Sequence, residues 1–195
     1  MTEKKFDPKK LDKLNDPKRL SDIPPALIWS RLNMAPPETI VDIGAGTGFF
    51  AKAFVPFLKK ETDTGRVFAC DISDTMLSWI KEHICPEFPA IHPLKMTETA
   101  VPLADGTADL VYMINLHHEL DSPEAILGEA HRLLTEGGVL FLADWKKEDM
   151  SQGPPRHRRC RTADVADQVR QAGFAGVRVF EDLPRHFLIV ARAAV

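Results

Sequence analysis

Three glycines at alternate positions, Gly44, Gly46 and Gly48, follow a short apolar run that ends in Asp42 within the segment VDIGAGTGFF. Glycine at this density indicates a backbone that bends sharply or comes close to a ligand. A dinucleotide-binding loop has the pattern G-x-G-x-x-G, which would place its third glycine at position 49. Phe49 occupies that position. The loop therefore departs from the pattern of NAD-dependent oxidoreductases, which remain an alternative.

Two acidic residues favour a ligand that carries an amino group and a ribose. Asp42 would repel a pyrophosphate but attract an ammonium group. Asp71 ends a second apolar run, RVFACD, where a carboxylate accepts hydrogen bonds from a ribose diol. A ligand with these groups and no phosphate is S-adenosylmethionine. The alternatives are a tight strand-to-helix turn for the glycines and a helix N-terminal acid for Asp71, a role that Ser73 or Asp74 could equally fill.

These residues need a framework, and the chain alternates between apolar runs and helical patterns. We expect strands at 39–43, 66–72, 90–96 (broken by Pro93), 109–116, 139–144 (after Gly137-Gly138), 177–180 and 187–191. We expect helices at 25–33, 48–60, 74–84, 123–134 and 162–172, the last capped by Thr162. Strands separated by helices indicate an α/β fold with a parallel sheet covered on both faces. The last two strands are joined by a turn, so they should pair antiparallel.

The composition is typical of one globular domain. The chain has 195 residues, of which 44% are hydrophobic and 27% charged, and its formal net charge is −3. This charge does not favour nucleic acid as a partner. Cys70, Cys85 and Cys160 form no CxxC pair, which indicates a reducing compartment. The sequence shows no signal peptide and no apolar stretch that could span a bilayer, so we expect a cytoplasmic protein with no membrane partner.

Five segments in order carry a family resemblance: VDIGAGTG, VFACDIS, VPLADGTADLVYMINLHHELD, HRLLTEGGVLFLAD and QAGF. Over residues 38–193 the chain resembles the class I S-adenosylmethionine-dependent methyltransferases, and within them the type 11, ubiquinone/menaquinone-methylase-like branch. The resemblance implies a doubly wound, Rossmann-like sheet of seven strands in the order 3-2-1-4-5-7-6, mostly parallel with the last strand antiparallel. It also implies that the chain transfers the methyl group of S-adenosylmethionine.

The resemblance assigns the donor-binding residues as well. Asp42 would lie near the methionine ammonium, and Asp71 would accept hydrogen bonds from the ribose hydroxyls. Ile72 would pack on the adenine, and Asn115 would lie beside the methionine and the reactive methyl group. The backbone of the loop would lie against the methionine portion, through Gly44, Ala45, Gly46 and Gly48.

One position departs from the family pattern. Relatives often carry an aspartate after the third strand, which accepts a hydrogen bond from the adenine amino group. Here the corresponding residues are Met96 and Thr97. The hydroxyl of Thr97 can still accept one hydrogen bond.

The sequence singles out no catalytic residue. His117 and His118 follow the fourth strand, where many relatives carry a similar run beside the methyl donor, and either histidine could act as a general base. Asp144 is a third candidate, and orienting or packing roles are the alternative for the histidines. Adjacent histidines lack the H-x-x-x-H spacing of a helical metal site, so we expect no metal.

The acceptor is expected to be a small molecule because the chain contains no separate domain for recognising RNA or protein. The run RHRRCR could hold an anionic acceptor through Arg156, Arg158 and Arg159, since arginine pairs well with carboxylate or phosphate. The alternative is a solvated loop, with Cys160 as an ordinary thiol. A donor-binding regulator without catalysis remains a second alternative to the enzyme.

Residues 1–37 are expected to form an N-terminal helical extension ahead of a methyltransferase domain at 38–195. The extension has too many apolar residues for a disordered tail: Phe6, Leu11, Leu14, Leu20, Ile23, Leu27, Ile28, Trp29 and Leu32. Because related proteins place such helices over the donor, we expect a lid that forms part of the acceptor pocket. The alternative is a segment that packs on the sheet as extra core.

Overall fold

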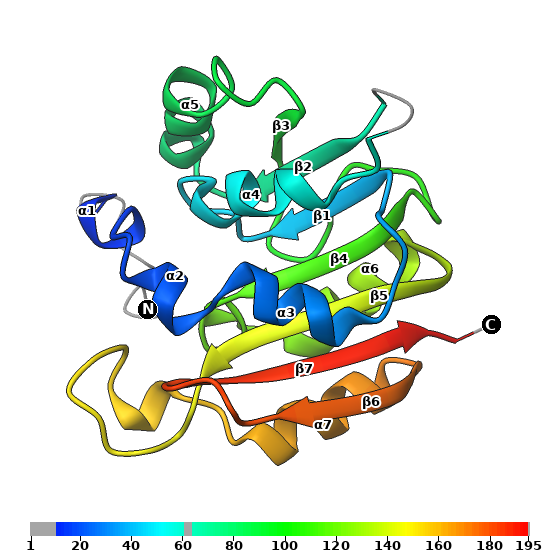
Figure 1. Cartoon of the computed structure of the whole chain (residues 1–195). Helices are drawn as coiled ribbons and strands as arrows, with labels where there is room; N and C mark the ends of the chain where they lie inside the picture. Colours follow the sequence, from blue (N-terminus) through cyan, green and yellow to red (C-terminus); the bar gives the residue numbers. More distant parts are fainter. Residues whose placement is uncertain (1–10, 61–63, 195) are drawn as a thin grey trace.

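The computed structural model describes residues 11–60 and 64–194. Its centre is a seven-stranded sheet in the order β3-β2-β1-β4-β5-β7-β6 (Figure 1). All neighbouring strands are parallel except β7, which runs antiparallel to both β5 and β6. The strands are β1 (Thr39–Ile43), β2 (Arg66–Asp71), β3 (Ile91–Lys95), β4 (Ala108–Ile114), β5 (Leu134–Trp145), β6 (Phe174–Phe180) and β7 (His186–Ala193). The expected fold class, strand order and antiparallel last strand are confirmed.

Helices cover both faces of this sheet (Figure 1). One face carries α3 (Pro25–Leu32), α4 (Phe49–Phe54) and α5 (Asp74–His83). The opposite face carries α6 (Pro123–Leu133) and α7 (Thr162–Gln171). Among the residues that the structure describes, the short helices α1 (Leu11–Leu14) and α2 (Arg19–Asp22) precede α3, and 3₁₀ turns lie at η2 (Val55–Phe57), η3 (His117–Glu119) and η4 (Arg156–Arg158). No helix in the described ranges is long and apolar enough to span a membrane.

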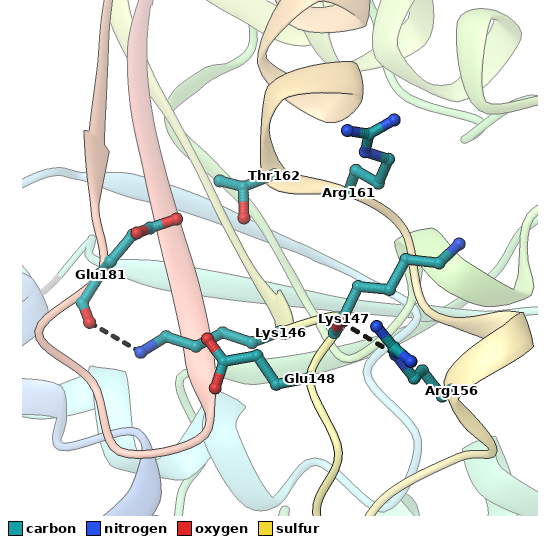
Figure 2. A pocket seen from close by; sticks show the side chains of 7 residues that line it. All are labelled: Lys146, Lys147, Glu148, Arg156, Arg161, Thr162 and Glu181. Carbon is teal, nitrogen blue, oxygen red and sulfur yellow. Dashed lines mark hydrogen bonds between the residues drawn. The ribbon is translucent and has the colours of Figure 1, made fainter.

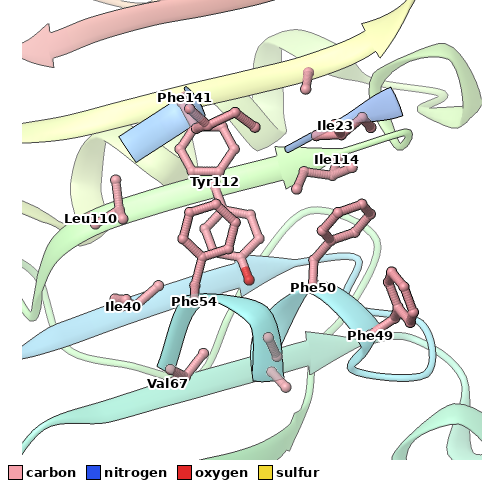
Figure 3. Packing of buried hydrophobic residues seen from close by; sticks show 14 of the residues in the cluster. Ile23, Ile40, Phe49, Phe50, Phe54, Val67, Leu110, Tyr112, Ile114 and Phe141 are labelled. Carbon is pink, nitrogen blue, oxygen red and sulfur yellow. The ribbon is translucent and has the colours of Figure 1, made fainter. Parts of the chain in front are cut away.

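Aromatic rings build the core between α4 and the sheet (Figure 3). Tyr112 of β4 and Phe141 of β5 stack with their ring centroids 4.7 Å apart, and Phe54 of α4 packs 5.0 Å and 5.3 Å from them. All three side chains are fully buried. This contact holds α4, and with it the preceding glycine loop, at the carboxyl ends of the central strands.

The third helix of the N-terminal extension belongs to the same core. Ile28 and Leu32 are fully buried, and Trp29 stacks on Phe57 with ring centroids 4.8 Å apart. This placement matches the alternative of extra core for α3. The helix α1 instead lies against the glycine loop through Leu14. Phe6 lies outside the described residues.

Four local expectations were wrong. The helix expected at 48–60 ends at Phe54 and continues as the 3₁₀ turn η2, which contains a proline. Pro93 does not break β3, because β3 is an edge strand and a proline without an N–H group is tolerated there. Thr162 is the first residue of α7, whose N-cap position is held by Arg161. Gly137 and Gly138 lie inside β5 at a register shift and do not precede the strand.

Candidate functional site

The glycine loop joins β1 to α4 at the carboxyl edge of the sheet. Gly44, Gly46 and Gly48 have φ values of 74°, 56° and 73°, which side chains rarely adopt. A Cβ atom on Gly44 would lie only 2.8 Å from the side chain of Leu116. The N–H groups of Gly44 and Ala45 donate hydrogen bonds to the carbonyl of Cys70 at 2.9 Å, which fixes the loop against the end of β2.

Asp71 ties the end of β2 to this loop. Its Oδ2 accepts a hydrogen bond from the N–H of Gly46 at 2.8 Å, and its Oδ1 accepts one from the N–H of Ser73 at 2.8 Å. Each carboxylate oxygen has a second lone pair with which to bind a ligand. Burial raises the pKa of Asp71, although the backbone hydrogen bonds oppose this effect. The next side chain, Ile72, is 38% exposed and offers an apolar surface beside the carboxylate.

Asp42 is a buried acid without a hydrogen bond to its Oδ2 anywhere in the described part of the chain. Its exposed fraction is 2%, and burial raises its pKa to about 7, with a further rise from the charge of Asp71. Tyr112 and Arg19 lower it in turn. The Tyr112 hydroxyl is close enough to influence Asp42, but its geometry does not complete a hydrogen bond. A cationic group of a ligand would satisfy this carboxylate.

Arg19 of α2 is a site residue that sequence reasoning missed. Its guanidinium lies 5.2 Å and 4.7 Å from the ring centroids of Phe49 and Phe50, and it donates a hydrogen bond to the carbonyl of Leu14. The charges of Arg19 and Asp42 attract each other. No spacing rule could have found it, because the N-terminal segment is rich in lysine and arginine and only the packing of α2 selects this one.

The third strand ends in residues that are partly engaged elsewhere. Met96 is 6% exposed, and its N–H donates a hydrogen bond to the carbonyl of Asp71. The Thr97 hydroxyl accepts hydrogen bonds from the N–H groups of Ala100 at 3.0 Å and Thr99 at 3.4 Å. The oxygen expected to replace the family's aspartate therefore already stabilises a local turn.

Asn115 follows β4 in an unusual conformation. Its φ of 57° is in the left-handed region, and its N–H donates a hydrogen bond to the carbonyl of Ala143 at 2.8 Å. Its Oδ1 is buried and, within residues 11–60 and 64–194, has no partner. Backbone strain of this kind clusters at active sites and ligand clamps, although asparagine tolerates it better than most residues. The free amide oxygen can accept a hydrogen bond from a ligand at this edge.

The catalytic candidates His117, His118 and Asp144 do not form one group, because His118 pairs with Asp144 and His117 has a different partner. His118 Nδ1 lies 2.7 Å from Asp144 Oδ1, and its side chain is 6% exposed. His117 instead has its Nε2 2.8 Å from Oε1 of Gln168 in α7, and burial lowers its pKa. A carboxylate that orients a histidine is the arrangement of a general base, so His118 with Asp144 is the better chemical candidate.

The arginines expected to bind an anionic acceptor do not act as one group. Arg159 is 3% exposed, and its guanidinium donates hydrogen bonds to four backbone carbonyls of the preceding loop: Lys146, Glu148, Gln152 and Pro154. This arginine holds the loop together and is not available to an acceptor, so its expected role was wrong. Arg158 lies near enough to His118 for its charge to lower the pKa of that ring. Arg156 is exposed.

A cavity of about 440 Å³ opens beside Arg156 (Figure 2). Four cationic side chains line it, with two acidic ones and the first residue of α7: Lys146, Lys147, Arg156, Arg161, Glu148, Glu181 and Thr162. Lys146 Nζ donates a hydrogen bond to the Glu181 carbonyl at 2.7 Å. The cavity begins directly after the carboxyl end of β5, so it shares the edge of the sheet with the glycine loop. Cations outnumber acids there, which favours an anionic ligand.

Among the residues described, no three or more His, Cys, Asp or Glu side chains gather as a metal would require. The polar groups gathered at this edge of the sheet are those of Asp42, Asp71, Asn115 and the His118–Asp144 pair.

Known proteins resemble the chain in sequence and in fold. A family model described as a methyltransferase domain matches residues 41–142. A crystal structure of a SAM-dependent methyltransferase from Aquifex aeolicus superposes with a TM-score of 0.90 at 30% identity, covering 97% of this chain and 100% of that one.

Two curated relatives are similar over a shorter region. The tRNA N(3)-cytidine methyltransferase METTL2 of Danio rerio is 28% identical over 62% of this chain and 35% of its own length. The ubiquinone/menaquinone biosynthesis C-methyltransferase UbiE of Cupriavidus metallidurans is 27% identical over 60% of this chain and 47% of its own. The chain thus matches less than half the length of either relative.

Proposed function

Because this chain belongs to the methyltransferase-domain family of S-adenosylmethionine-dependent enzymes, we propose that it transfers the methyl group of S-adenosylmethionine to a small-molecule acceptor. The observation that carries the proposal is the buried Oδ2 of Asp42 behind the glycine loop, which has no hydrogen-bond partner within the described part of the chain. A buried carboxylate of this kind is suited to the ammonium group of a methionine moiety and unsuited to a pyrophosphate. An NAD-dependent activity is disfavoured because the loop has Phe49 in place of the third glycine and because Asp42 would repel a pyrophosphate.

The residues at the edge of the sheet fit the donor. Asp42 would bind the ammonium, Asp71 would accept from the ribose hydroxyls, and Ile72 would pack against the adenine. Asn115 would lie beside the methionine. Thr97 is a weaker candidate for the adenine amino group, since its hydroxyl already accepts two backbone hydrogen bonds. The donor supplies a methyl group on a positively charged sulfur, which is electrophilic without help from the protein.

The main catalytic contribution of the chain is then alignment. Holding two reactants in a productive geometry can lower a barrier by roughly 7–11 kcal/mol in favourable cases. A base is needed only where the acceptor must lose a proton. His118 can hold that proton at Nε2, because Asp144 fixes the ring through Nδ1 and Oε1 of Glu119 lies 3.7 Å from Nε2.

The first two helices would act as a cover. A Cβ atom on Gly46 would lie 3.5 Å from Leu14 Cδ1, so α1 lies against the glycine loop. An ion pair between Arg185 and Asp22 fastens α2 at the other side. Arg19, between these two contacts, is placed to pair with the carboxylate of a methionine moiety. This segment would exclude water from the reacting groups.

The cationic cavity supports an acceptor with a carboxylate or phosphate group. Two residues of the run RHRRCR, Arg156 and Arg161, line it together with Lys146 and Lys147. Two relatives differ in acceptor by name, one acting on tRNA and one in quinone biosynthesis. RNA is therefore included among the acceptors to be tested.

Calorimetry with S-adenosylhomocysteine and with NAD provides the first test. We expect the former to bind and the latter not to, and binding of NAD alone would refute the proposal. Formation of S-adenosylhomocysteine from S-adenosylmethionine is then measured with aromatic carboxylates, phenols, amines, phosphorylated metabolites and transfer RNA. Donor binding without turnover on any of them would favour the non-catalytic regulator.

A further inference from the structure

His186, the first residue of β7, is a polar side chain that is buried in the interior. Its exposed fraction is 1%, and neither ring nitrogen has a hydrogen-bond partner among the residues that the structure describes. Burial lowers the pKa of the ring to about 4, so the imidazole is neutral at physiological pH. A neutral imidazole has one hydrogen-bond donor and one acceptor, and leaving both unpaired in the interior is unfavourable.

The direction of β7 brings this histidine to the edge of the sheet that holds the site. Because β7 runs antiparallel to β5, its first residue pairs with Trp145, the last residue of β5. The rings of His186 and Trp145 lie with their centroids 4.2 Å apart. The parallel strands β1 and β4 carry Asp42 and Asn115 at this same edge.

Arg19 lies close to both His186 and the donor-binding end of the site. The charge of Arg19 acts on Asp42 and also on His186, so one guanidinium lies near both residues. Asp22, on the same short helix, acts on His186 too, as do Arg185 and Asp144. His186 is thus enclosed by α2, by the end of β5 and by the start of β7, next to the end of the site where Asp42 lies.

We propose that His186 binds the reacting group of the methyl acceptor, and that this group is a neutral hydroxyl or N–H. The inference rests on the proposed methyl transfer and names one contact within it. The imidazole accepts a hydrogen bond from such a group and orients its lone pair, while the Trp145 ring supplies an adjacent apolar surface. The neutral imidazole itself supplies no positive charge to pair with a carboxylate or phosphate.

The cationic cavity could bind a second, anionic group of the same acceptor. One of its lining residues, Lys146, directly follows Trp145, and the N–H of Lys146 donates a hydrogen bond at 3.0 Å to the carbonyl of Arg185, the residue before His186. An acceptor that spans both would place a neutral nucleophile at His186 and an anionic group among Lys146, Lys147 and Arg161. Hydroxylated or amino-substituted carboxylates and phosphates have this combination.

The test compares His186→Phe with His186→Asn. Phenylalanine fills similar space without polar atoms, so we expect Tm to rise by roughly 2–4 °C as an unpaired buried group is removed. Methyl transfer to the acceptor found in the screen should fall at least tenfold. Asparagine retains a donor and an acceptor, so we expect it to recover part of the transfer rate. Calorimetric affinity for S-adenosylhomocysteine should remain unchanged in both variants.

His92→Phe, which adds the same ring at an exposed position on β3, is the control for Tm, donor binding and transfer. A lower Tm or loss of folding in both His186 variants would reveal a structural partner and overturn the inference. Wild-type transfer by His186→Phe would overturn it as well. The unfolding measurement needs no acceptor, so a loss of stability in both variants overturns the inference even before an acceptor is found. Failure of the wild-type chain to bind S-adenosylhomocysteine would instead refute the proposed function.

Discussion

The Nδ1 atom of His118 lies 2.7 Å from Oδ1 of Asp144, with both side chains almost entirely buried. Asp144 Oδ2 also accepts a hydrogen bond from the backbone N–H of His118 at 3.0 Å. Burial opposes ionisation of both groups, but their hydrogen bond and mutual attraction outweigh it. The pKa of His118 is therefore raised, and the pKa of Asp144 is lowered. One ion pair thus joins the turn after β4 to the end of β5.

Asp144→Asn should make the unfolding free energy less dependent on pH. The raised pKa of His118 contributes stability that is complete below its unfolded value of about 6.5 and is lost as pH rises through the folded value. The lowered pKa of Asp144 contributes stability above about pH 4. We expect Asp144→Asn to cost about 3–5 kcal/mol at pH 6, the range for breaking a buried pair, and less at pH 8.5. Urea unfolding across this range measures the difference, with exposed Asp149→Asn as the control. An equal loss at both pH values would contradict the ion pair.

Asp42 should make the affinity for the donor rise with pH. Its pKa near 7 means that the carboxylate becomes charged as pH rises. Pairing with an ammonium requires the charged form, so the affinity for S-adenosylhomocysteine should increase by about tenfold from pH 6 to pH 8. In Asp42→Asn the affinity should be lower at pH 8 and should vary little with pH. Calorimetry at both pH values checks this, and a steep pH dependence that persists in the variant would assign it to another group.

Asp71→Ala should weaken donor binding by about 1.5–3 kcal/mol, the range for hydrogen bonds to charged groups. The variant loses the ribose acceptor and also the bond from Asp71 to the N–H of Gly46, so the loop should become more mobile while the sheet stays folded. Asp74→Ala is the matched control, because its exposed carboxylate pairs with Lys95 outside the loop. Calorimetry with S-adenosylhomocysteine compares the two, and equal affinities for Asp71→Ala and wild type would remove Asp71 from the site.

Hydrogen exchange with and without S-adenosylhomocysteine tests the lid. We expect added protection at 11–22 when the ligand binds, because α1 lies on the glycine loop and α2 beside Asp42. Residues 25–32 should already be protected in the free protein, since α3 is part of the core. Protection at Gly44 to Gly48 with no change at 11–22 would show that α1 and α2 are structural only.

Arg159→Lys should destabilise the loop that follows β5. A lysine ammonium cannot satisfy the four carbonyls that the guanidinium bonds, and leaving buried acceptors unpaired costs about 1–3 kcal/mol. Urea unfolding and limited proteolysis within 147–155 should both report the loss. Arg156→Lys, at an exposed position, should change neither, and an unaffected Arg159→Lys protein would mean that the loop is held by other contacts.

The sequence itself determined the framework of the site. Alternating apolar and helical segments predicted the layered α/β fold, and the resemblance supplied the strand order that the structure confirms. The glycine spacing predicted backbone that only glycine adopts readily, and Gly44, Gly46 and Gly48 all have positive φ. These predictions succeeded because the conformation of a loop and the end of a strand depend mainly on residues that are adjacent in the sequence.

The partners of long and ionisable side chains depended on tertiary structure alone. Arg159 and Arg156 look alike in the sequence, yet one is enclosed by the carbonyls of its own loop and the other lines a cavity. The charge of Arg19 acts on Asp42, and the ring of His186 packs against Trp145, only because α2 and β7 return to the edge where β1 and β5 end. Local spacing carries no information about such contacts, since they are fixed by the packing of segments that are distant in the chain.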